Sequence, residues 1–328
     1  MPLLQLKTLS IGYVDRRPHK VVHESINLSL QRGELTCLLG MNGAGKSTLL
    51  KTLGGFQPAL SGEILLEGKE LHDYSRKELA QKLGVVLTDR VASGNLTVYE
   101  LVSFGRHVYT SFFGRLSTED HKAVRDALDC MGIGNFGNRN LLELSDGERQ
   151  KVMIAKAIAQ ETELILLDEP TAFLDLSSRV EIMLLLRKLT SEQGKTVLLS
   201  THDLDLAIQL SDKIWLMAKH RQIESGIPED LAISGTLNSF FDKENLSFDL
   251  SNGAFKINIE EEKPIYLEAD DATYIWMKKA LNRKGFSISA TPTLPSIIQK
   301  GNKFAVATES GTFEALCIED CLTHLTQH

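Results

Sequence analysis

Cysteine is scarce in this sequence, with four residues in 328 and no paired spacing in the early part of the chain. This usage fits a reducing compartment, so we expect a cytoplasmic protein. An excess of positive charge is also missing: the formal net charge is -7, and broad affinity for nucleic acid is therefore not expected. No apolar run approaches the roughly 20 residues that span a bilayer. The apolar stretch within residues 1–13 is too short and too often interrupted by polar residues to be a secretory signal. If the protein works at a membrane, we expect it to do so through a partner.

What remains is an ordinary globular composition, with 42% hydrophobic and 24% charged residues. The length predicts two domains, at about 150 residues per domain. Along most of the chain, apolar strand patterns alternate with helical patterns. This alternation is typical of an α/β fold in which helices cover a mostly parallel sheet.

One stretch organises the sequence. The apolar run 35–39 predicts a strand, and a helical pattern begins near Lys46. Between them lies the phosphate-binding pattern G-x-x-x-x-G-K-[ST], whose glycines let backbone N–H groups point at phosphate oxygens; a ligand-free glycine-rich turn is the disfavoured alternative. Lys46 can reach the β- and γ-phosphates, and the Ser47 hydroxyl can ligate Mg²⁺. The residues expected to hold the nucleotide are Gly40, Met41, Asn42, Gly43, Ala44, Gly45, Lys46, Ser47 and Thr48.

Two later strand patterns also end in polar residues. The strand at 164–167 leads into Asp168 and Glu169, and the strand at 195–200 is followed by His202. Because the carboxyl ends of parallel strands gather at one sheet edge, these residues can meet the phosphate-binding loop. Asp168 is suited to hold Mg²⁺, and Glu169 is suited to orient or deprotonate an attacking water. His202 could contact the γ-phosphate. The alternative for Asp168 and Glu169 is a solvated strand end, and the alternative for His202 is a structural histidine. Because polar motifs follow three strands of the same sheet, both alternatives are disfavoured.

Several residues mark helix starts. Ser145 is placed as the N-cap of a long helix, and Gly147 permits close approach, so this helix start is a second candidate anion site. Thr97 and Glu100 have the spacing of a capping box. Thr118 is the expected N-cap of the amphipathic helix that follows it.

The order of these motifs resembles the nucleotide-binding subunit of ABC transporters over roughly residues 3–258. Tyr13, whose ring could stack on a base or could be an ordinary core or surface tyrosine, stands where that family stacks adenine. Asp175 belongs to the D-loop segment and is counted with the nucleotide-binding residues. The matching segments are the phosphate loop (Walker A), LSDGE at 144–148 (signature), LILLDEP at 164–170 (Walker B), AFLD at 172–175 (D-loop) and STHD at 200–203 (switch-histidine loop).

The resemblance implies an α/β ABC ATPase with a phosphate-loop parallel-sheet core and a helical signature subdomain. It implies ATP and Mg²⁺ as cofactors. Two copies would pair head to tail as a homodimer, so that each ATP lies between Walker A of one copy and Ser145 and Gly147 of the other. The further partners would be an integral-membrane permease and, indirectly, a periplasmic or lipoprotein substrate-binding protein. The chain would thus be peripheral on the inner face of the cell membrane.

The signature departs from the family pattern at two positions. Asp146 stands for one of the two glycines, and Glu148 stands for the glutamine. A carboxylate added near a phosphate is electrostatically unfavourable unless it faces solvent. Because Ser145 and Gly147 are kept, we expect function to survive.

A second departure lies at the end of the strand at 84–87, where the family has glutamine and this chain has Thr88. Threonine is shorter by roughly 2–3 Å of side chain. It still offers a hydroxyl to Mg²⁺ or to a Mg²⁺-bound water. Our hypothesis is that Thr88 or Asp89 takes the role through water.

Residues 95–120 resemble the corresponding segment of iron-chelate importers, a subfamily that includes ferric-siderophore, haem and cobalamin uptake ATPases. A generic helical surface is the alternative for this segment. We therefore expect the ATP-hydrolysing subunit of an ABC importer for iron-siderophore, haem or cobalamin. A soluble ABC ATPase serving a non-transport assembly machine is the competing hypothesis. Segment 95–120 argues against an exporter, and Glu169 with His202 argues against a protein that binds ATP without hydrolysing it.

The family pattern stops near residue 259, and residues 259–328 are expected to form a small α+β extension of unknown role, in regulation or dimer support. A helix over 272–285, a strand from 286 and a hairpin around 309–311 are its main features. A metal site is one reading of Cys317, Cys321, His324 and His328. Ordinary buried thiols are favoured, because a terminal histidine would fray.

Overall fold

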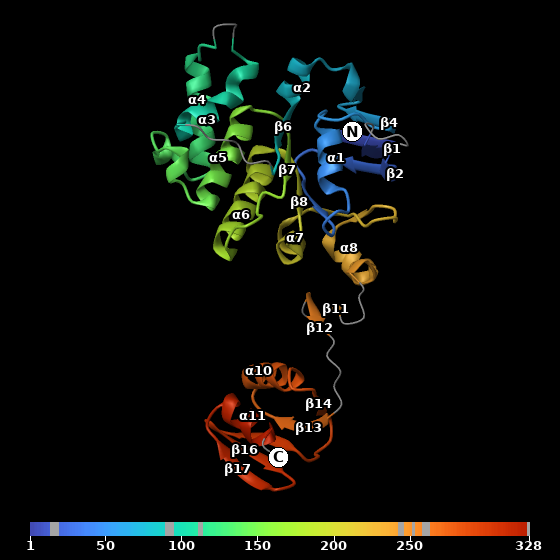
Figure 1. Ribbon diagram of the computed structural model, residues 1–328, viewed down its shortest axis with the longest axis vertical. Helices are drawn as coiled ribbons and strands as arrows, with labels where there is room; N and C mark the ends of the chain where they lie inside the picture. Colours follow the sequence, from blue (N-terminus) through green and yellow to red (C-terminus); the bar gives the residue numbers. More distant parts are fainter. Residues whose placement is uncertain are drawn as a thin grey trace. The chain divides into compact units, whose positions relative to one another are not determined.

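A computed structural model describes residues 1–13, 20–88, 95–110, 114–241, 246–250, 253–257 and 263–326. The chain divides into two compact units, Met1–Phe240 and Phe241–His328, which are described separately (Figure 1). The expected boundary between residues 258 and 259 lies outside the described residues. Within the described ranges, no helix combines the length and the hydropathy needed to cross a membrane.

A six-stranded sheet forms the centre of the first unit. Its strands are β3 (Leu35–Leu39), β6 (Leu83–Val86), β7 (Leu164–Asp168), β8 (Thr196–Thr201), β9 (Lys213–Leu216) and β10 (Glu224–Gly226). They lie in the order β10-β9-β3-β8-β7-β6, and all neighbours are parallel except β9 and β10. Every residue of β3, β7 and β8 is buried, as expected for parallel strands covered on both faces. The predicted α/β class with a mostly parallel sheet is confirmed.

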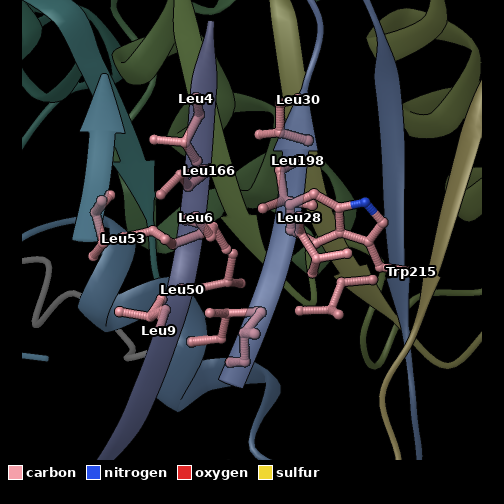
Figure 2. Packing of buried hydrophobic residues seen from close by; sticks show 14 of the residues in the cluster. Leu4, Leu6, Leu9, Leu28, Leu30, Leu50, Leu53, Leu166, Leu198 and Trp215 are labelled. Atoms are coloured by element: carbon pink, nitrogen blue, oxygen red, sulfur yellow. The ribbon is translucent and has the colours of Figure 1, made fainter. Parts of the chain in front are cut away.

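An antiparallel sheet packs against this centre through leucines. Its strands are β1 (Leu4–Tyr13), β2 (Lys20–Leu30), β4 (Ser61–Leu66) and β5 (Lys69–Glu70), in the order β2-β1-β4-β5. Alternate residues of β1 and β2 point into the core, where they meet Leu50, Leu166, Leu198 and the fully buried Trp215 (Figure 2). Burying a leucine side chain contributes about 1.5–3 kcal/mol, so this core fixes the sheet that carries the site.

Helices cover the sheet and form a separate helical part of the first unit, in which α3, α4 and α5 pack on one another (Figure 1). The α-helices are α1 (Lys46–Leu53), α2 (Arg76–Lys82), α3 (Val98–Ser103), α4 (Thr118–Cys130), α5 (Asp146–Ala159), α6 (Leu176–Gln193), α7 (Leu204–Leu210), α8 (Pro228–Ile233) and α9 (Thr236–Phe241). Short 3₁₀ helices are η1 (Leu71–Asp73), η2 (Phe104–Val108), η3 (Gly134–Phe136) and η4 (Leu141–Glu143).

Capping boxes begin several of these helices. The predicted box of Thr97 and Glu100 is confirmed at α3, where each side chain bonds to the other residue's backbone N–H. The predicted N-cap of α4 is wrong by one position. Ser117 has the extended backbone of an N-cap, and its hydroxyl accepts from the N–H of Asp120. Thr118 is already the first helical residue, because the capping partner lies three residues after Ser117.

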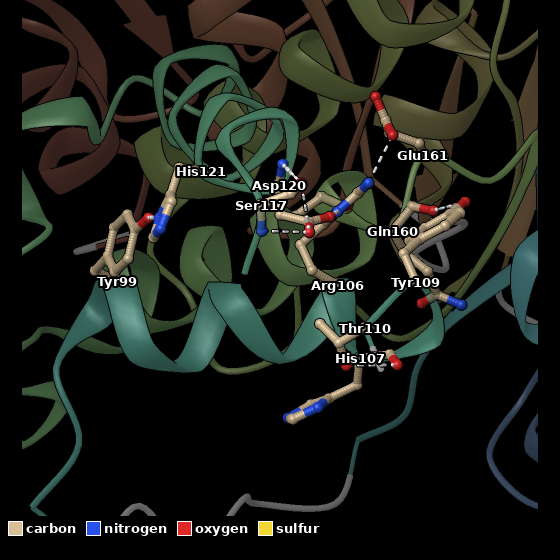
Figure 3. Close-up of polar contacts among 11 residues, drawn as sticks. Tyr99, Arg106, His107, Tyr109, Thr110, Ser117, Asp120, His121, Gln160 and Glu161 are labelled. Atoms are coloured by element: carbon tan, nitrogen blue, oxygen red, sulfur yellow. Dashed lines mark hydrogen bonds and ion pairs between the residues drawn. The ribbon is translucent and has the colours of Figure 1, made fainter. Parts of the chain in front are cut away.

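Arg106 of η2 ties the helical part together (Figure 3). Its Nε lies 2.8 Å from Oδ1 of Asp120, and its Nη1 lies 2.6 Å from Oε2 of Glu161. Nη1 also donates to the carbonyl of Ala159 at 2.8 Å. Burial would raise the pKa of Asp120, but hydrogen bonds from Ser117 and Arg106 outweigh burial and hold that pKa below its usual value. One guanidinium thus joins η2 to the start of α4 and the end of α5.

The second unit contains a hairpin and a five-stranded sheet with two helices. Its elements are β11 (Leu246–Asp249), β12 (Ala254–Ile257), β13 (Lys263–Glu268), α10 (Asp271–Asn282), β14 (Phe286–Ser289), β15 (Ser296–Lys300), β16 (Lys303–Thr308), β17 (Gly311–Ala315) and α11 (Ile318–Thr326). The larger sheet has the order β14-β13-β15-β16-β17, and both helices share its core. The predicted α+β extension with a hairpin at 309–311 is therefore confirmed in its fold.

The residues of the tail that gave the disfavoured metal reading are not gathered into a site in the part that the structure describes. Cys321 is fully buried in the core of the second unit, and Cys317 is exposed. Burial raises the pKa of the Cys321 thiol to about 12. His328 lies outside the described residues, and among the described ones no group of three or more His, Cys, Asp or Glu could hold a metal ion.

The Arg106 cluster gives a prediction about stability. Asp120→Asn removes the charge of a side chain that is 8% exposed and leaves the buried Arg106 poorly paired, so it should destabilise the protein by about 2–3 kcal/mol. Glu161→Gln is the matched control, because the Glu161 side chain is 59% exposed and its ion pair should contribute less than about 1 kcal/mol. Thermal unfolding of both variants measures the difference. Equal losses would contradict the assignment of Asp120 as the principal partner.

Candidate functional site

The phosphate-binding loop takes the predicted position between β3 and α1. Its backbone needs glycine at two places. Gly45 is the N-cap of α1 with φ at 110°, and a Cβ there would lie 2.4 Å from Cγ1 of Val22. A Cβ on Gly40 would lie 2.3 Å from the carbonyl oxygen of Met217. The loop thus packs between β2 and the residue that follows β9, and it leads into the N-terminus of α1, where an anion can bind.

Lys46 joins this loop to the end of β7. Its side chain is 5% exposed, and its Nζ donates to the carbonyl of Gly40 at 2.7 Å. The same Nζ lies 3.3 Å from Oε1 of Glu169. A second support was missed from the sequence: Nε2 of the buried His23 lies 3.1 Å from the carbonyl of Ala44. Burial lowers the pKa of His23, so it braces the loop as a neutral imidazole at neutral pH.

Asp168 is held by two hydroxyl groups at the carboxyl end of β7. Its Oδ1 accepts from Ser200 at 2.7 Å, and its Oδ2 accepts from Thr88 at 2.8 Å. Ser200 also accepts from the backbone N–H of Glu169 at 2.9 Å. The sequence analysis named Ser200 only as part of the STHD segment and gave it no role. Its role becomes visible in the parallel pairing of β7 and β8, where Ser200 lies opposite Asp168. The structure thus brings Thr88 to the acid, while Asp89 lies outside the described residues.

Glu169 is placed between two cationic or titratable side chains. Its backbone adopts the left-handed region with φ at 49°, which is uncommon for a residue with a side chain and often marks a functional position. One carboxylate oxygen faces Lys46, and Oε2 lies 3.9 Å from Nδ1 of His202. The His202 side chain is 58% exposed. The predicted trio of Lys46, Glu169 and His202 is therefore close together at one sheet edge.

A cavity of about 780 Å³ opens over the phosphate-binding loop. Tyr13 stands at its wall, with its hydroxyl 3.2 Å from Oγ1 of Thr48 and its side chain about half exposed. The cavity gathers most of the predicted nucleotide-binding residues. Its lining consists of Tyr13, Lys20, Val21, Val22, Asn42, Gly43, Ala44, Gly45, Lys46, Ser47, Thr48, Thr88, Glu169, Lys219 and His220.

The signature segment does not line this cavity. Ser145 is the N-cap of α5 as predicted, and its hydroxyl accepts from the N–H of Glu148. Glu148 accepts from the Ser145 N–H and lies 3.0 Å from Nη1 of Arg139, and these contacts lower the pKa of Glu148 despite partial burial. Asp146 is largely exposed and lies 3.9 Å from Arg149. The two added carboxylates of the signature thus each face a guanidinium.

Two more predicted residues lie away from the phosphate loop. Gly147 is close to α6, since a Cβ there would lie 3.1 Å from Oγ of Ser178. Asp175 is the N-cap of α6 and accepts from the N–H of Ser178 and the hydroxyl of Ser177. These hydrogen bonds lower the pKa of Asp175 to about 2. Within one chain, Ser145, Gly147 and Asp175 therefore form no part of the wall around the loop cavity.

Comparison with known proteins shows to which family the chain is similar. The ABC transporter family matches residues 23–172, and the family described as the iron ABC transporter C-terminal domain matches residues 262–326. An ABC transporter ATP-binding protein of Methanocaldococcus jannaschii is 42% identical over 78% of this chain and 87% of that protein. The iron(3+)-hydroxamate import ATP-binding protein FhuC of Bacillus subtilis is 40% identical over 74% of this chain and 88% of that protein.

A solved structure gives the same result for the fold. The dimeric structure of a bacterial ABC transporter cassette is 28% identical and superposes with a TM-score of 0.59, covering 69% of this chain and 98% of that cassette. These likenesses cover the motifs whose side chains converge at the carboxyl edge of the parallel sheet. The chain belongs to the family of ATP-binding, ATP-hydrolysing subunits of ABC transporters, and it carries the iron ABC transporter C-terminal domain.

Proposed function

We propose that this protein hydrolyses ATP at the loop cavity to drive the import of iron chelates through a membrane permease. The observation that carries the chemistry is the convergence of Lys46, Asp168 and Glu169 at one sheet edge. The likeness to an iron(3+)-hydroxamate import protein and the iron ABC C-terminal domain support the cargo class, of which iron-siderophore is favoured over haem or cobalamin.

The predicted residues at and beside the loop cavity have separate tasks in this proposal. The amides of residues 40–48 and the Lys46 ammonium bind the phosphates, and Tyr13 stacks on adenine. Water attacks the γ-phosphorus while Glu169 accepts its proton, the bond to the β-phosphate oxygen breaks, and ADP leaves. His202, 3.9 Å from Glu169, is close enough to contact the γ-phosphate region.

The residues present also fit Mg²⁺ held together with the nucleotide. Asp168 offers carboxylate oxygens and Ser47 a hydroxyl, which are the hard donors that Mg²⁺ prefers. Few protein ligands are expected, since Mg²⁺ commonly keeps waters and binds substrate phosphates. When bound, Mg²⁺ supplies positive charge that stabilises the transferred phosphoryl group. Thr88, bonded to Asp168, would act on this ion through the carboxylate or through a water.

The remaining predicted residues act in a dimer under this proposal. Ser145, Gly147 and Asp175 lie outside the cavity of their own chain, so a second copy placed head to tail would bring them to the bound ATP. The related cassette of known structure is a dimer, which supports this arrangement. The permease would hold the pair at the inner face of the membrane, and a substrate-binding protein would deliver the cargo on the other side.

Hydrolysis is tested by two variants and a control. Glu169→Gln should lower kcat by about 10²–10⁴ while ATP still binds, because the general base is lost and the phosphate loop is kept. Lys46→Ala should weaken ATP binding itself. Glu192→Gln, which changes an exposed acid of α6, should behave as wild type.

The same Glu169→Gln variant tests the dimer. With ATP bound and uncleaved it should sediment as a dimer, whereas Lys46→Ala should remain a monomer at the same ATP concentration. A Glu169→Gln protein that stays monomeric with saturating ATP would contradict the head-to-tail arrangement. If Glu169→Gln retained full ATP hydrolysis, the assignment of Glu169 as the general base would be wrong.

The role of Thr88 is tested by Mg²⁺ titration. Thr88→Ala removes the hydroxyl that bonds to Asp168, so the Mg²⁺ concentration for half-maximal ATPase activity should rise by up to about tenfold. Thr88→Ser keeps the hydroxyl and should stay near wild type. If Thr88→Ala left both the Mg²⁺ dependence and the transport coupling unchanged, the assignment of Thr88 to the Mg²⁺ site would be wrong.

Import is tested in the native host. Affinity capture of the chain from detergent-solubilised membranes should recover a polytopic permease in about equal amount. Cells that carry only Glu169→Gln should lose uptake of radiolabelled iron(3+)-hydroxamate, and wild-type protein should restore it. Recovery without any membrane partner, together with unchanged uptake, would favour a soluble assembly ATPase instead.

A further inference from the structure

Lys219 lies at the phosphate-binding loop although it is far from that loop in sequence. Strand β9 pairs in parallel with β3, with Leu216 opposite Leu39, so both strands end at the same sheet edge. Beyond them, the N–H of Met217 donates to the carbonyl of Leu39 at 2.8 Å. The chain that leaves β9 therefore runs directly alongside the start of the loop.

The turn after β9 brings the Lys219 ammonium to Gly43. Nζ lies 3.4 Å from the position that a Cβ on Gly43 would occupy, and Lys219 lines the loop cavity. The next residue, His220, has φ at 59° in the left-handed region, which reverses the chain there. Arg221 then anchors the turn, since its Nη1 donates to the carbonyl of Ser239 at 3.2 Å.

Lys219 is exposed, so water solvates its ammonium in the nucleotide-free protein, and a phosphate that enters the cavity can replace that water. Among the described residues, Lys46 is paired with Glu169, whereas Lys219 takes part in no ion pair. An ammonium directed at a glycine of the loop contacts nothing that compensates its charge within the described chain. A polyphosphate on the loop would supply that partner, since ammonium–phosphate contacts are strong, charge-assisted hydrogen bonds.

We infer that Lys219 is a second cationic nucleotide-binding residue, supplied by the β9–β10 connection and directed at the phosphates that ATP and ADP share. The inference rests on the phosphate-loop site proposed above. The Lys219 ammonium lies beside Gly43 of the loop, and among the described residues no ion pair or hydrogen bond joins it to Glu169 or His202 at the reacting end. It therefore contributes to the binding of both nucleotides and leaves the chemical step unchanged.

Nucleotide affinity tests this inference directly. Lys219→Ala should raise the Kd for ADP and for ATP by the same factor, about three- to tenfold, because one partly solvated charge contact is lost. The effect should shrink at high salt, and Lys219→Arg should retain most of the affinity. Calorimetric titration gives both constants, and steady-state kinetics should show a raised KM with kcat within about twofold of wild type.

Lys213→Ala is the matched control, because Lys213 begins β9, the strand that leads to Lys219, but lies opposite Thr36, away from the loop. It should leave both affinities unchanged. The melting temperature of nucleotide-free Lys219→Ala should equal that of the wild-type protein. If it is lowered enough to explain the weaker nucleotide binding, Lys219 has a structural role and the inference is wrong.

The outcomes separate this inference from the proposed site. If Lys219→Ala binds ADP as tightly as the wild-type protein while Lys46→Ala does not bind it, the inference about Lys219 is wrong and the proposed site is retained. A loss limited to ATP, or a fall in kcat, would also overturn it, because the contact would then be to the γ-phosphate or the reacting atoms. Failure of the wild-type protein to bind ADP would overturn both the site and the inference.

Discussion

The site depends on the register of three parallel strands. Leu39 of β3 lies opposite Thr201 of β8, and Asp168 of β7 lies opposite Ser200 of β8, so the three strands end in step. A slip of one residue would turn Asp168 to the other face of the sheet and separate it from the Ser200 hydroxyl. The packing on both faces of the sheet holds this register, because a slip would turn side chains that fit one face toward the elements packed on the other face. The chemistry of the edge is thus a consequence of the packing below it.

Carboxylates crowd this part of the molecule, and each has a donor. Asp168 accepts from two hydroxyls, Glu169 faces Lys46, and Glu148 is shared between Arg139 and the Ser145 N–H. Such partners are required because an unpaired charge in a desolvated position is strongly unfavourable. The pairing of Glu148 also reduces the repulsion that a carboxylate in the signature would exert on a nearby phosphate. The carboxylate is occupied with capping α5 and with a guanidinium, so its charge is compensated next to a helix start that is proposed to face a phosphate.

The sequence was sufficient for the fold class and for the motifs that follow apolar strands, because each motif is contiguous and its strand is recognisable by burial. Ser200 and Lys219 were beyond it, since their roles depend on which strands are neighbours and on the lateral register between segments that are distant in sequence. The contact of Arg139 with Glu148 depends likewise on how the turn before α5 folds back. At α4, Ser117 and Thr118 both carry a hydroxyl, so only the backbone conformation decides between them.

Thr88 occupies the place where the fold connects the helical part to the nucleotide cavity. A second cavity of about 190 Å³ lies between the sheet edge and α5, with Asp146 and Arg149 among its lining residues. Thr88 and Glu169 border both this cavity and the loop cavity. The threonine hydroxyl is committed to Asp168, whereas a longer glutamine could extend further from the strand end. Residues of α5 line the second cavity together with Thr88 and Glu169, so a displacement of α5 would change the surroundings of both residues and of the Thr88–Asp168 hydrogen bond.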